Sequence, residues 1–418
     1  MPGRCLKVGI ESFFNQYWEY LSIPLVSALV GYGTNWLAVK MMMGPLTFRG
    51  VGPIGWQGVI PANAEKMARV VVRHCVEKVL PQSELMSRID PDELTESLQH
   101  RIQPFVEELV DTVMEQTQSY GLSVSNFIWS ASPLILKNKV YKEVSEKIPA
   151  VVAKVVEDIK NNSDDYIDLN QLIVEKLTNN KQLLVDIFKQ SAKKEFIFIE
   201  RSGFYFGLPL GLPVMFIWYY FPVWWLLPFF GLLVGYITNA LAIYLIQKPI
   251  EPIKVGPFVV QGLFLKRQKE VSRYYGSVFS SDLLRAEVVA AEILKSQRAV
   301  DHLRELIHRE VNREIESAQG PFKALTVVSI GPKEYAKIGK IISELALSEL
   351  QHPDKRTLRY IDQAFDIEET VADRVGNLPG EEFFELLHPI IEEDEWKLIA
   401  VGAALGLVAG IGQWLLLT

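Results

Sequence analysis

The sequence has little of the chemistry that enzymes and metal proteins need. Its 418 residues include two cysteines, Cys5 and Cys75, too few for a disulfide framework and without a CxxC pair for zinc. The six histidines are scattered along polar stretches. The sequence also lacks the HExxH, GxSxG and P-loop patterns and a GxGxxG that follows a strand. We therefore expect no metal, no other cofactor and no enzymatic activity.

A positive charge excess is missing as well. The formal net charge is -7, whereas nucleic-acid-binding domains are usually strongly basic. We expect no nucleic-acid partner. The first twenty residues carry charged side chains, and the apolar run that follows them does not end in an AxA-like cleavage site. A cleavable signal peptide is therefore not expected.

Charged residues are almost absent from four long apolar runs. A helix needs roughly 20 apolar residues to cross a bilayer, and the runs that meet this length cover residues 21–43, 203–220, 223–246 and 398–417. The sequence predicts an all-α membrane protein with about four transmembrane helices.

The rest of the chain is rich in Glu, Lys and Asp. It comprises an N-terminal segment, 1–20, and two long segments, 44–202 and 247–397. In the long segments apolar residues recur at helical spacing, and Asp90 followed by Pro91 marks the start of one helix. We expect two helical soluble domains. No alternating run predicts a strand, apart from Ala324–Ile330.

Lysine and arginine gather on one side of the expected spans. Within about 20 residues of the span ends, the two long segments carry ten of these residues, and the opposite side carries Arg4 and Lys7. Because cytoplasmic loops are enriched in Lys and Arg, we expect the soluble domains to be cytoplasmic.

The chain also repeats itself. Residues 24–69 align without a gap to 228–273, and 16 of the 46 positions are identical. Glycines four residues apart then open the second and fourth spans: Gly203, Gly207 and Gly211 in one, and Gly402, Gly406 and Gly410 in the other. The sequence predicts two tandem copies that run in the same direction and are related by a pseudo-twofold axis along the membrane normal.

These motifs resemble those of a known family. A Thr-Asn-x-Leu-Ala block at Thr34 and Thr238, a proline loop with Gln-Gly and a glycine-striped last span are similar to the YheB-like bacterial membrane proteins. That family's domain has no assigned function. The resemblance covers nearly the whole chain, once per half, although Leu265 and Ile237 depart from Pro61 and Gly33 of the first copy. It implies a multi-pass, mostly helical protein of the bacterial inner membrane and no reaction.

Polar residues inside the spans are one candidate site. Thr34, Asn35, Thr238 and Asn239 lie within apolar runs, where an amide must find a polar partner. The asparagines could hydrogen-bond across the first and third spans and fix their packing. Alternatively, they could form a polar site for an ion or a lipid headgroup.

The glycine stripes and the proline loops are two further candidates. Glycines at four-residue spacing share a helix face and favour close helix packing. The loops contain Gln57, Gly58, Gln261 and Gly262 among prolines and apolar residues. Each loop could be a rigid connector, or a re-entrant or lipid-contacting segment that uses its glutamine as a polar contact.

Two classes of function follow from these patterns. The first is a membrane-anchored helical scaffold or assembly factor whose cytoplasmic helices bind a protein partner. The second is a small transporter or lipid-handling protein with a polar site between the repeats. In both cases membrane lipid is an expected partner, and the sequence leaves the oligomeric state open.

Overall fold

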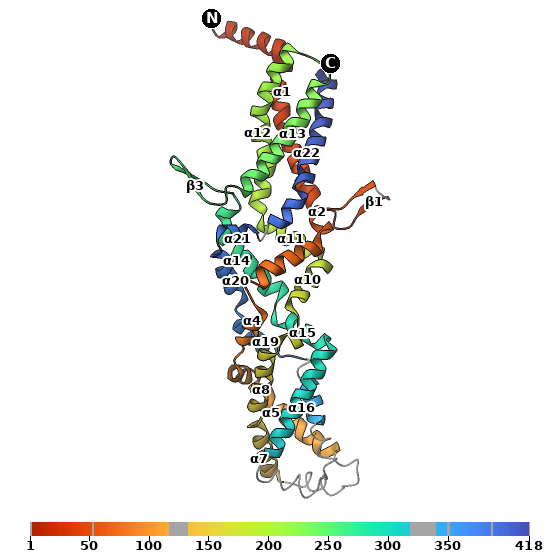
Figure 1. Ribbon diagram of the computed structural model, residues 1–418, viewed down its shortest axis with the longest axis vertical. Helices are drawn as coiled ribbons and strands as arrows, with labels where there is room; N and C mark the ends of the chain where they lie inside the picture. The colour runs from red at the N-terminus through yellow and green to blue at the C-terminus, as the bar shows by residue number, and fades with distance from the viewer. Residues whose placement is uncertain are drawn as a thin grey trace. The chain divides into compact units, whose positions relative to one another are not determined.

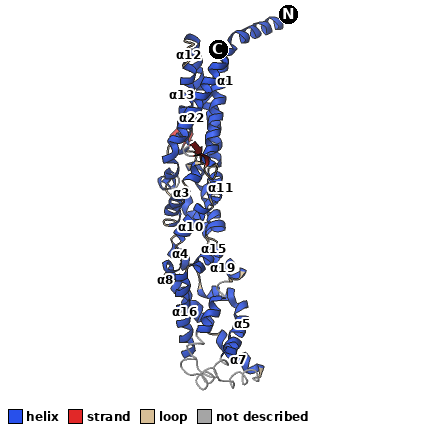
Figure 2. Cartoon of the chain, turned by 90° about the vertical axis from the view of Figure 1, so that its right-hand side faces the viewer, coloured by secondary structure: helices blue, strands red, loops and turns tan. Residues whose placement is uncertain are grey.

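The computed structural model describes residues 2–51, 54–116, 133–317, 340–348, 352–385 and 388–417. The strand candidate Ala324–Ile330 lies outside these ranges. Within them the chain is mostly helical, as expected, and its strands are few and short (Figure 2).

Two compact units make up the chain, and each is assembled from separated stretches. The first unit contains Met1–Cys75, Ile173–Tyr275 and Val371–Thr418. The second contains Val76–Leu172 and Gly276–Thr370. The second unit thus joins parts of the two long segments that the sequence analysis assigns to separate soluble domains.

Four long apolar helices dominate the first unit. They are α1 (Pro2–Met43), α12 (Lys193–Tyr220), α13 (Leu226–Gln247) and α22 (His388–Leu417). The parts long and apolar enough to cross a membrane are Ser22–Met43, Lys193–Tyr220, Leu226–Gln247 and Glu395–Leu416. The prediction of four such helices is confirmed. The segment expected to precede the first span is helical too and belongs to α1.

The four helices associate mainly as two antiparallel pairs. α1 packs along α12, and α13 packs along α22, while smaller contacts join α12 to α13 and α1 to α22 (Figure 1). Ile23, Val214 and Trp218 form an apolar cluster with Leu226 and Leu227, near the turn that connects α12 to α13. Each long segment, 44–202 and 247–397, is therefore flanked by two helices that pack against one another.

Short elements complete the first unit. Five of those described lie wholly within it: α2 (Val59–Ala62), α3 (Ala64–Val71), α11 (Lys181–Ser191), the 3₁₀ turn η3 (Leu265–Arg267) and α21 (Gly380–Glu385). Four others lie partly in the first unit and partly in the second: η1 (Val72–Val76), α10 (Leu169–Asn179), α14 (Gln268–Val278) and α20 (Ile367–Gly376).

Two β-hairpins also belong to the first unit, where the sequence analysis expected no strands. β1 (Arg49–Val51) pairs with β2 (Ile54–Trp56), and β3 (Ile253–Val255) pairs with β4 (Phe258–Val260), both antiparallel. Each strand has three residues, too few for alternation to be visible in the sequence. The signal that marked them is the Val-Gly-Pro sequence shared by both loops, since glycine and proline favour turns.

The second unit is a set of helices. It contains α4 (Gln82–Ser87), α5 (Pro91–Gln116), α7 (Leu134–Ser145), α8 (Ile148–Asn161), α9 (Ser163–Tyr166), the π-helical turn η4 (Phe279–Leu283), α15 (Ala286–Lys295), α16 (Gln297–Ser317), α19 (Lys355–Phe365) and a helical segment at 340–348. At the start of α5, Asp90 Oδ1 accepts hydrogen bonds from the amides of Asp92 and Glu93, at 2.8 and 3.1 Å. This cap confirms the start predicted for that helix.

A polar cluster lies beside the apolar core of this unit. Tyr166 is fully buried, and its hydroxyl donates to the Asp158 carboxylate, which also lies 3.0 Å from His302 Nε2. Partial burial raises the pKa of Asp158, but the hydrogen bonds from Tyr166 and His302 outweigh this effect and leave the pKa below its ordinary value. The same burial and the bond to Asp158 raise the pKa of Tyr166. The cluster joins α8, α9 and α16.

Candidate functional site

Asn35 joins the two helices of the first pair. Its side chain is fully buried. The amide nitrogen donates to the carbonyl oxygen of Ile199 on α12 at 2.7 Å and lies 3.4 Å from Ser202 Oγ. Thr34 bonds within its own helix, to the Gly31 carbonyl at 3.0 Å. The polar pair therefore has partners inside the α1–α12 contact.

Asn239 has the corresponding position in the second pair. Its amide nitrogen donates to the carbonyl oxygen of Leu398 on α22 at 2.8 Å, and Thr238 bonds to the Gly235 carbonyl of its own helix at 3.3 Å. The packing hypothesis expected bonds across the first and third spans. Instead, each asparagine donates to the span that closes its own half. The amide oxygens of Asn35 and Asn239 accept no hydrogen bond from the described part of the chain.

The glycines of α12 lie where this helix touches α1. A methyl group at Gly203 would overlap the backbone of Gly31, and the reverse substitution would clash in the same way. At Gly207 and Gly211 a methyl group would meet backbone atoms of the α1 segment that contains Pro24 and Ser27, at 2.6 Å. Glycine at these three positions therefore allows the two backbones to touch directly. Any side chain there would increase the distance between the helices.

α22 meets α13 in the same manner. A methyl group at Gly406 would overlap Gly231, and one at Gly410 would overlap the backbone of Leu227. At Gly402 it would overlap the amide of Asn239. This asparagine thus lies directly against a glycine of the neighbouring helix, where no space separates them.

The Gln-Gly pairs close the base of each hairpin. Gln57 donates to the carbonyl oxygen of Leu46 at 2.7 Å, and Gln261 donates to that of Ile250 at 3.1 Å. The amide nitrogens of the following glycines, Gly58 and Gly262, donate to the carbonyl oxygens of the prolines that follow the spans, at 3.0 and 2.9 Å. A methyl group at either glycine would overlap the backbone at the end of the span. The glutamine side chains and the glycine amides thus form hydrogen bonds with backbone carbonyl groups, as expected of residues in a rigid connector.

An ionic network lies close to the start of α12. Arg267 contacts the buried carboxylate of Glu195 and also Glu270 at 3.0 Å, and Lys194 contacts Glu270 at 2.8 Å. The hydrogen bonds from Arg267 and Lys194 lower the pKa of Glu270 to about 2. These cations therefore already have carboxylate partners.

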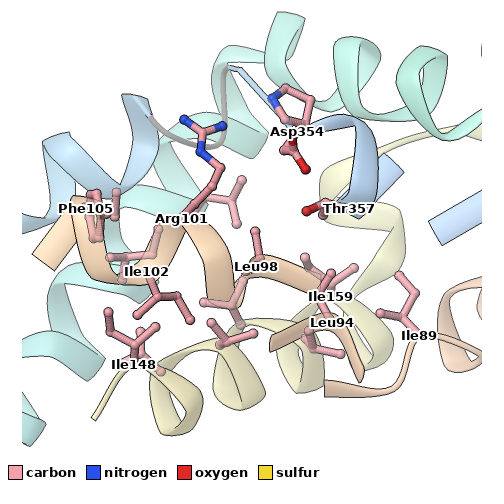
Figure 3. Close-up of a pocket in the computed structure, with 18 of the residues that line it drawn as sticks. Ile89, Leu94, Leu98, Arg101, Ile102, Phe105, Ile148, Ile159, Asp354 and Thr357 are labelled. Atoms are coloured by element: carbon pink, nitrogen blue, oxygen red, sulfur yellow. The ribbon is translucent and has the colours of Figure 1, made fainter. Parts of the chain in front are cut away.

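A large apolar cavity occupies the second unit (Figure 3). Its volume is about 430 Å³, and its lining residues come mainly from α5, α8, α15, α16, α19 and the segment 340–348, with Met86 of α4 and Val144 of α7 beside them. Most are Leu, Ile, Val and Ala. Examples are Leu98, Ile102, Val155, Ala290 and Ile342.

The few charged groups of this cavity lie at its margins. Figure 3 shows Arg101, Asp354 and Thr357 on one side and the labelled isoleucines and leucines on the other. Arg101 donates to the His352 carbonyl at 2.9 Å, and Lys147 forms an ion pair with Glu314 at 3.0 Å. The arrangement suits an amphipathic ligand with a long apolar part. The sequence analysis missed this site, because amphipathic helices carry no local signal of an unfilled space between them.

No candidate metal-binding site is found among the described residues. They contain no group of three or more His, Cys, Asp or Glu side chains placed to hold a metal ion. The apolar cavity and the span contacts are therefore the features from which a function can be argued.

Comparison with known proteins points to a membrane protein. The chain is 24% identical, over 170 residues, to a UPF0754 membrane protein of Bacillus pumilus (strain SAFR-032), a match that covers 37% of this chain and 45% of that relative. The match thus spans less than half the length of the curated relative. No family model and no solved structure matches the chain. The similarity and the four apolar helices together indicate a membrane protein, and the relative's name implies no reaction.

Proposed function

We propose that this protein is a membrane-anchored lipid-binding protein. Its four spans hold it in the bilayer, and its second unit takes up the hydrocarbon chain of a lipid. The observation that carries this proposal is the cavity of about 430 Å³ among aliphatic side chains. This is the lipid-handling alternative of the sequence analysis, with the ligand placed in the second unit and not between the spans.

The size of the cavity is the first argument for an occupant. Empty apolar space costs stability, about 24 cal/mol per Å³ where it is fully enclosed, and this partly open space of about 430 Å³ is lined by aliphatic side chains that have no packing partner on that side. Water is a poor filler, because each water molecule needs two to four polar partners, and the lining offers few.

The nature of the lining is the second argument. Ligand pockets of this size are common, but those for flat or polar ligands contain aromatic rings and converging hydrogen-bond groups. Here the lining is almost entirely aliphatic, with Phe105 and Phe365 as its aromatic residues, and the polar groups lie at the margin. A flexible acyl chain, whose burial contributes about 0.8 kcal/mol per CH₂, fits this chemistry best.

The membrane setting forms part of the same proposal. We place the protein in the bacterial inner membrane as a multi-pass protein without enzymatic activity. Its long segments face the cytoplasm, because ten Lys and Arg residues lie on their side of the spans and two on the other. We also infer a tandem duplication, supported by the corresponding contacts of Asn35 and Asn239 and of Gln57 and Gln261.

A helical scaffold for a protein partner is the second candidate. The observation in its favour is the pair Leu134 and Ile135 at the start of α7, whose side chains are 75% and 84% exposed. Exposed apolar side chains of this kind can bind a partner helix. A transporter with a polar site among the spans has weaker support, since the amide donors of both asparagines bond to backbone carbonyls.

Photo-crosslinking can test the lipid proposal. The full-length protein would be reconstituted with a phospholipid whose acyl chain carries a diazirine, irradiated, digested and mapped by mass spectrometry. We expect crosslinks on α5, α8 and α15 in addition to those on the spans. Ala290→Trp, which fills the cavity, should reduce the crosslinks on these helices several-fold and leave those on the spans unchanged.

Ala150→Trp is the matched control. Ala150 is exposed on α8 and does not line the cavity, so this variant should keep the wild-type crosslinks. Crosslinks confined to the spans in the wild-type protein would contradict the proposal and favour the scaffold.

A further inference from the structure

The two β-hairpins expose apolar side chains at the ends of membrane spans. β1 begins at Arg49, a few residues after α1 ends at Met43, and β3 begins at Ile253, a few residues after α13 ends at Gln247. In Figure 1 both hairpins extend away from the helices of the span bundle. Because the spans lie in the bilayer, the hairpins must lie at or near its surface.

Their exposed side chains are large and apolar. In the first hairpin and the loop before it, Val51 is 87% exposed and Phe48 is 52% exposed. In the second hairpin, Ile253 and Val259 are 52% and 50% exposed. An isolated two-stranded hairpin is at best marginally stable in water, and apolar side chains left in water forgo the burial that would stabilise it.

Both faces of the second hairpin carry such side chains. Ile253 pairs with Val260 and Lys254 with Val259, and neighbouring residues of a strand point to opposite faces. Ile253 and Val260 therefore share one face, while Val259 lies on the other. A hairpin that docks on a protein surface needs one apolar face. A hairpin with apolar side chains on both faces suits immersion in an apolar medium.

The base of each hairpin is fixed to the span. Trp56 of β2 donates its indole N–H to the Met41 carbonyl of α1 at 3.0 Å. In the second hairpin, Lys266 of η3 donates to the Val259 carbonyl at 3.3 Å, and just after the hairpin the Phe264 amide donates to the Ile246 carbonyl of α13 at 3.3 Å. These contacts, together with the bonds of Gln57 and Gln261, hold both hairpins at the level where the spans end.

Basic side chains accompany the apolar ones. Arg49 on β1 and Lys254 on β3 are both exposed. Lysine and arginine at a membrane surface are attracted by anionic headgroups, and they keep the charge in the headgroup layer while neighbouring apolar side chains enter the acyl region.

We propose that both hairpins insert into the lipid interface on the side of the long segments, with Val51 and Phe48 of the first and Ile253 and Val259 of the second at the headgroup–acyl boundary. The bilayer is thus the partner of these surfaces. This proposal does not depend on the cavity. It assigns lipid contact to the hairpin side chains, while the glutamines of the loops, which the sequence analysis considered as polar contacts, serve the backbone.

Site-specific fluorescence quenching can test the insertion. In a full-length protein with Cys5→Ser and Cys75→Ser, Val51→Cys or Val259→Cys would be labelled with the environment-sensitive dye NBD. The protein would be reconstituted in vesicles of phosphatidylethanolamine and phosphatidylglycerol. Lys154→Cys, on an exposed position of α8, is the matched control. Quenchers would be doxyl-labelled lipid in the bilayer and iodide in the aqueous phase.

We expect doxyl lipid to quench the labels at 51 and 259 at least threefold more than the label at 154, and iodide to show the opposite order. Labels at 51 and 259 that iodide reaches as readily as at 154, with no lipid quenching, would overturn the proposal. A second measurement uses Ile253→Cys with and without Val259→Asp. The added carboxylate should move the label from lipid quenching toward iodide quenching, and an unchanged ratio would also count against insertion.

Discussion

The two units pack aliphatic helices in opposite ways. In the first unit, glycines of α12 and α22 bring backbones into contact with α1 and α13, so that a single methyl group would not fit. In the second unit, α5, α8, α15, α16 and α19 surround a space of about 430 Å³. None of these five helices contains a glycine.

The difference shows what branched side chains do to helix spacing. Leu, Ile and Val keep helix axes apart, and they leave a void when their shapes do not interlock. Glycine stripes remove that spacing, because only hydrogen atoms separate the two backbones. Apolar composition alone therefore does not decide whether a helical region is filled or hollow. The position of the small residues decides it.

The largest expected effect comes from adding a side chain to a span contact. Gly31→Val should destabilise the protein by about 3 kcal/mol or more, because the new atoms would overlap the backbone of Gly203 and force the helices apart. Gly33→Val, two residues away on the same helix, has open space around it and should change stability by less than about 0.5 kcal/mol. Thermal melting in detergent, followed by size-exclusion chromatography, measures both. Equal losses would show that the backbone contact is not what matters.

Removing the asparagine amides should have a smaller effect. Asn35→Ala and Asn239→Ala should each cost about 0.6–2 kcal/mol, the range for interhelical hydrogen bonds in membranes. The loss should be larger at Asn35, whose amide has Ser202 as a second neighbour. The same melting experiment applies, with insertion checked by membrane fractionation. A fully folded protein that loses its cellular function in either variant would instead favour a polar site.

Adding a side chain to the second unit should act in the opposite direction. In lipid-free protein, Ala290→Leu should stabilise by about 1 kcal/mol, because it fills part of the cavity. The gain should disappear when lipid is bound, since the side chain and the acyl chain compete for one space. Melting temperatures with and without added lipid would show this. A destabilisation in both states would mean that the cavity is already filled by the protein itself.

The smallest effect concerns pH. The pKa of Asp158 is below its ordinary value of 3.8 in the folded protein, so its ionised form stabilises the fold above that value. This contribution is lost as the pH falls through the lower folded-state pKa. Asp158→Asn should therefore flatten the acid side of the stability profile of the second unit. Hydrogen exchange of α8 and α16 across this pH range measures it, and an unchanged acid profile would exclude a role for the carboxylate.

Much of the first unit could be predicted from local patterns. Span length and hydropathy are properties of consecutive residues, so the four apolar helices followed directly from the sequence. The glycines at four-residue spacing also predicted close packing, because that spacing places them on one helix face. The hairpins escaped prediction, since three-residue strands carry no measurable alternation.

The sequence by itself thus determined the membrane character, the helical class and the recurrence of the motifs around Asn35 and Asn239. Only the tertiary structure decided which helix each motif meets, namely α12 for Asn35 and α22 for Asn239. It also decided that residues from both 76–172 and 276–370 line one apolar cavity. The physical reason is that a cavity arises from the shapes of side chains far apart in the chain, whereas hydropathy and helical spacing are set by neighbours within a few turns.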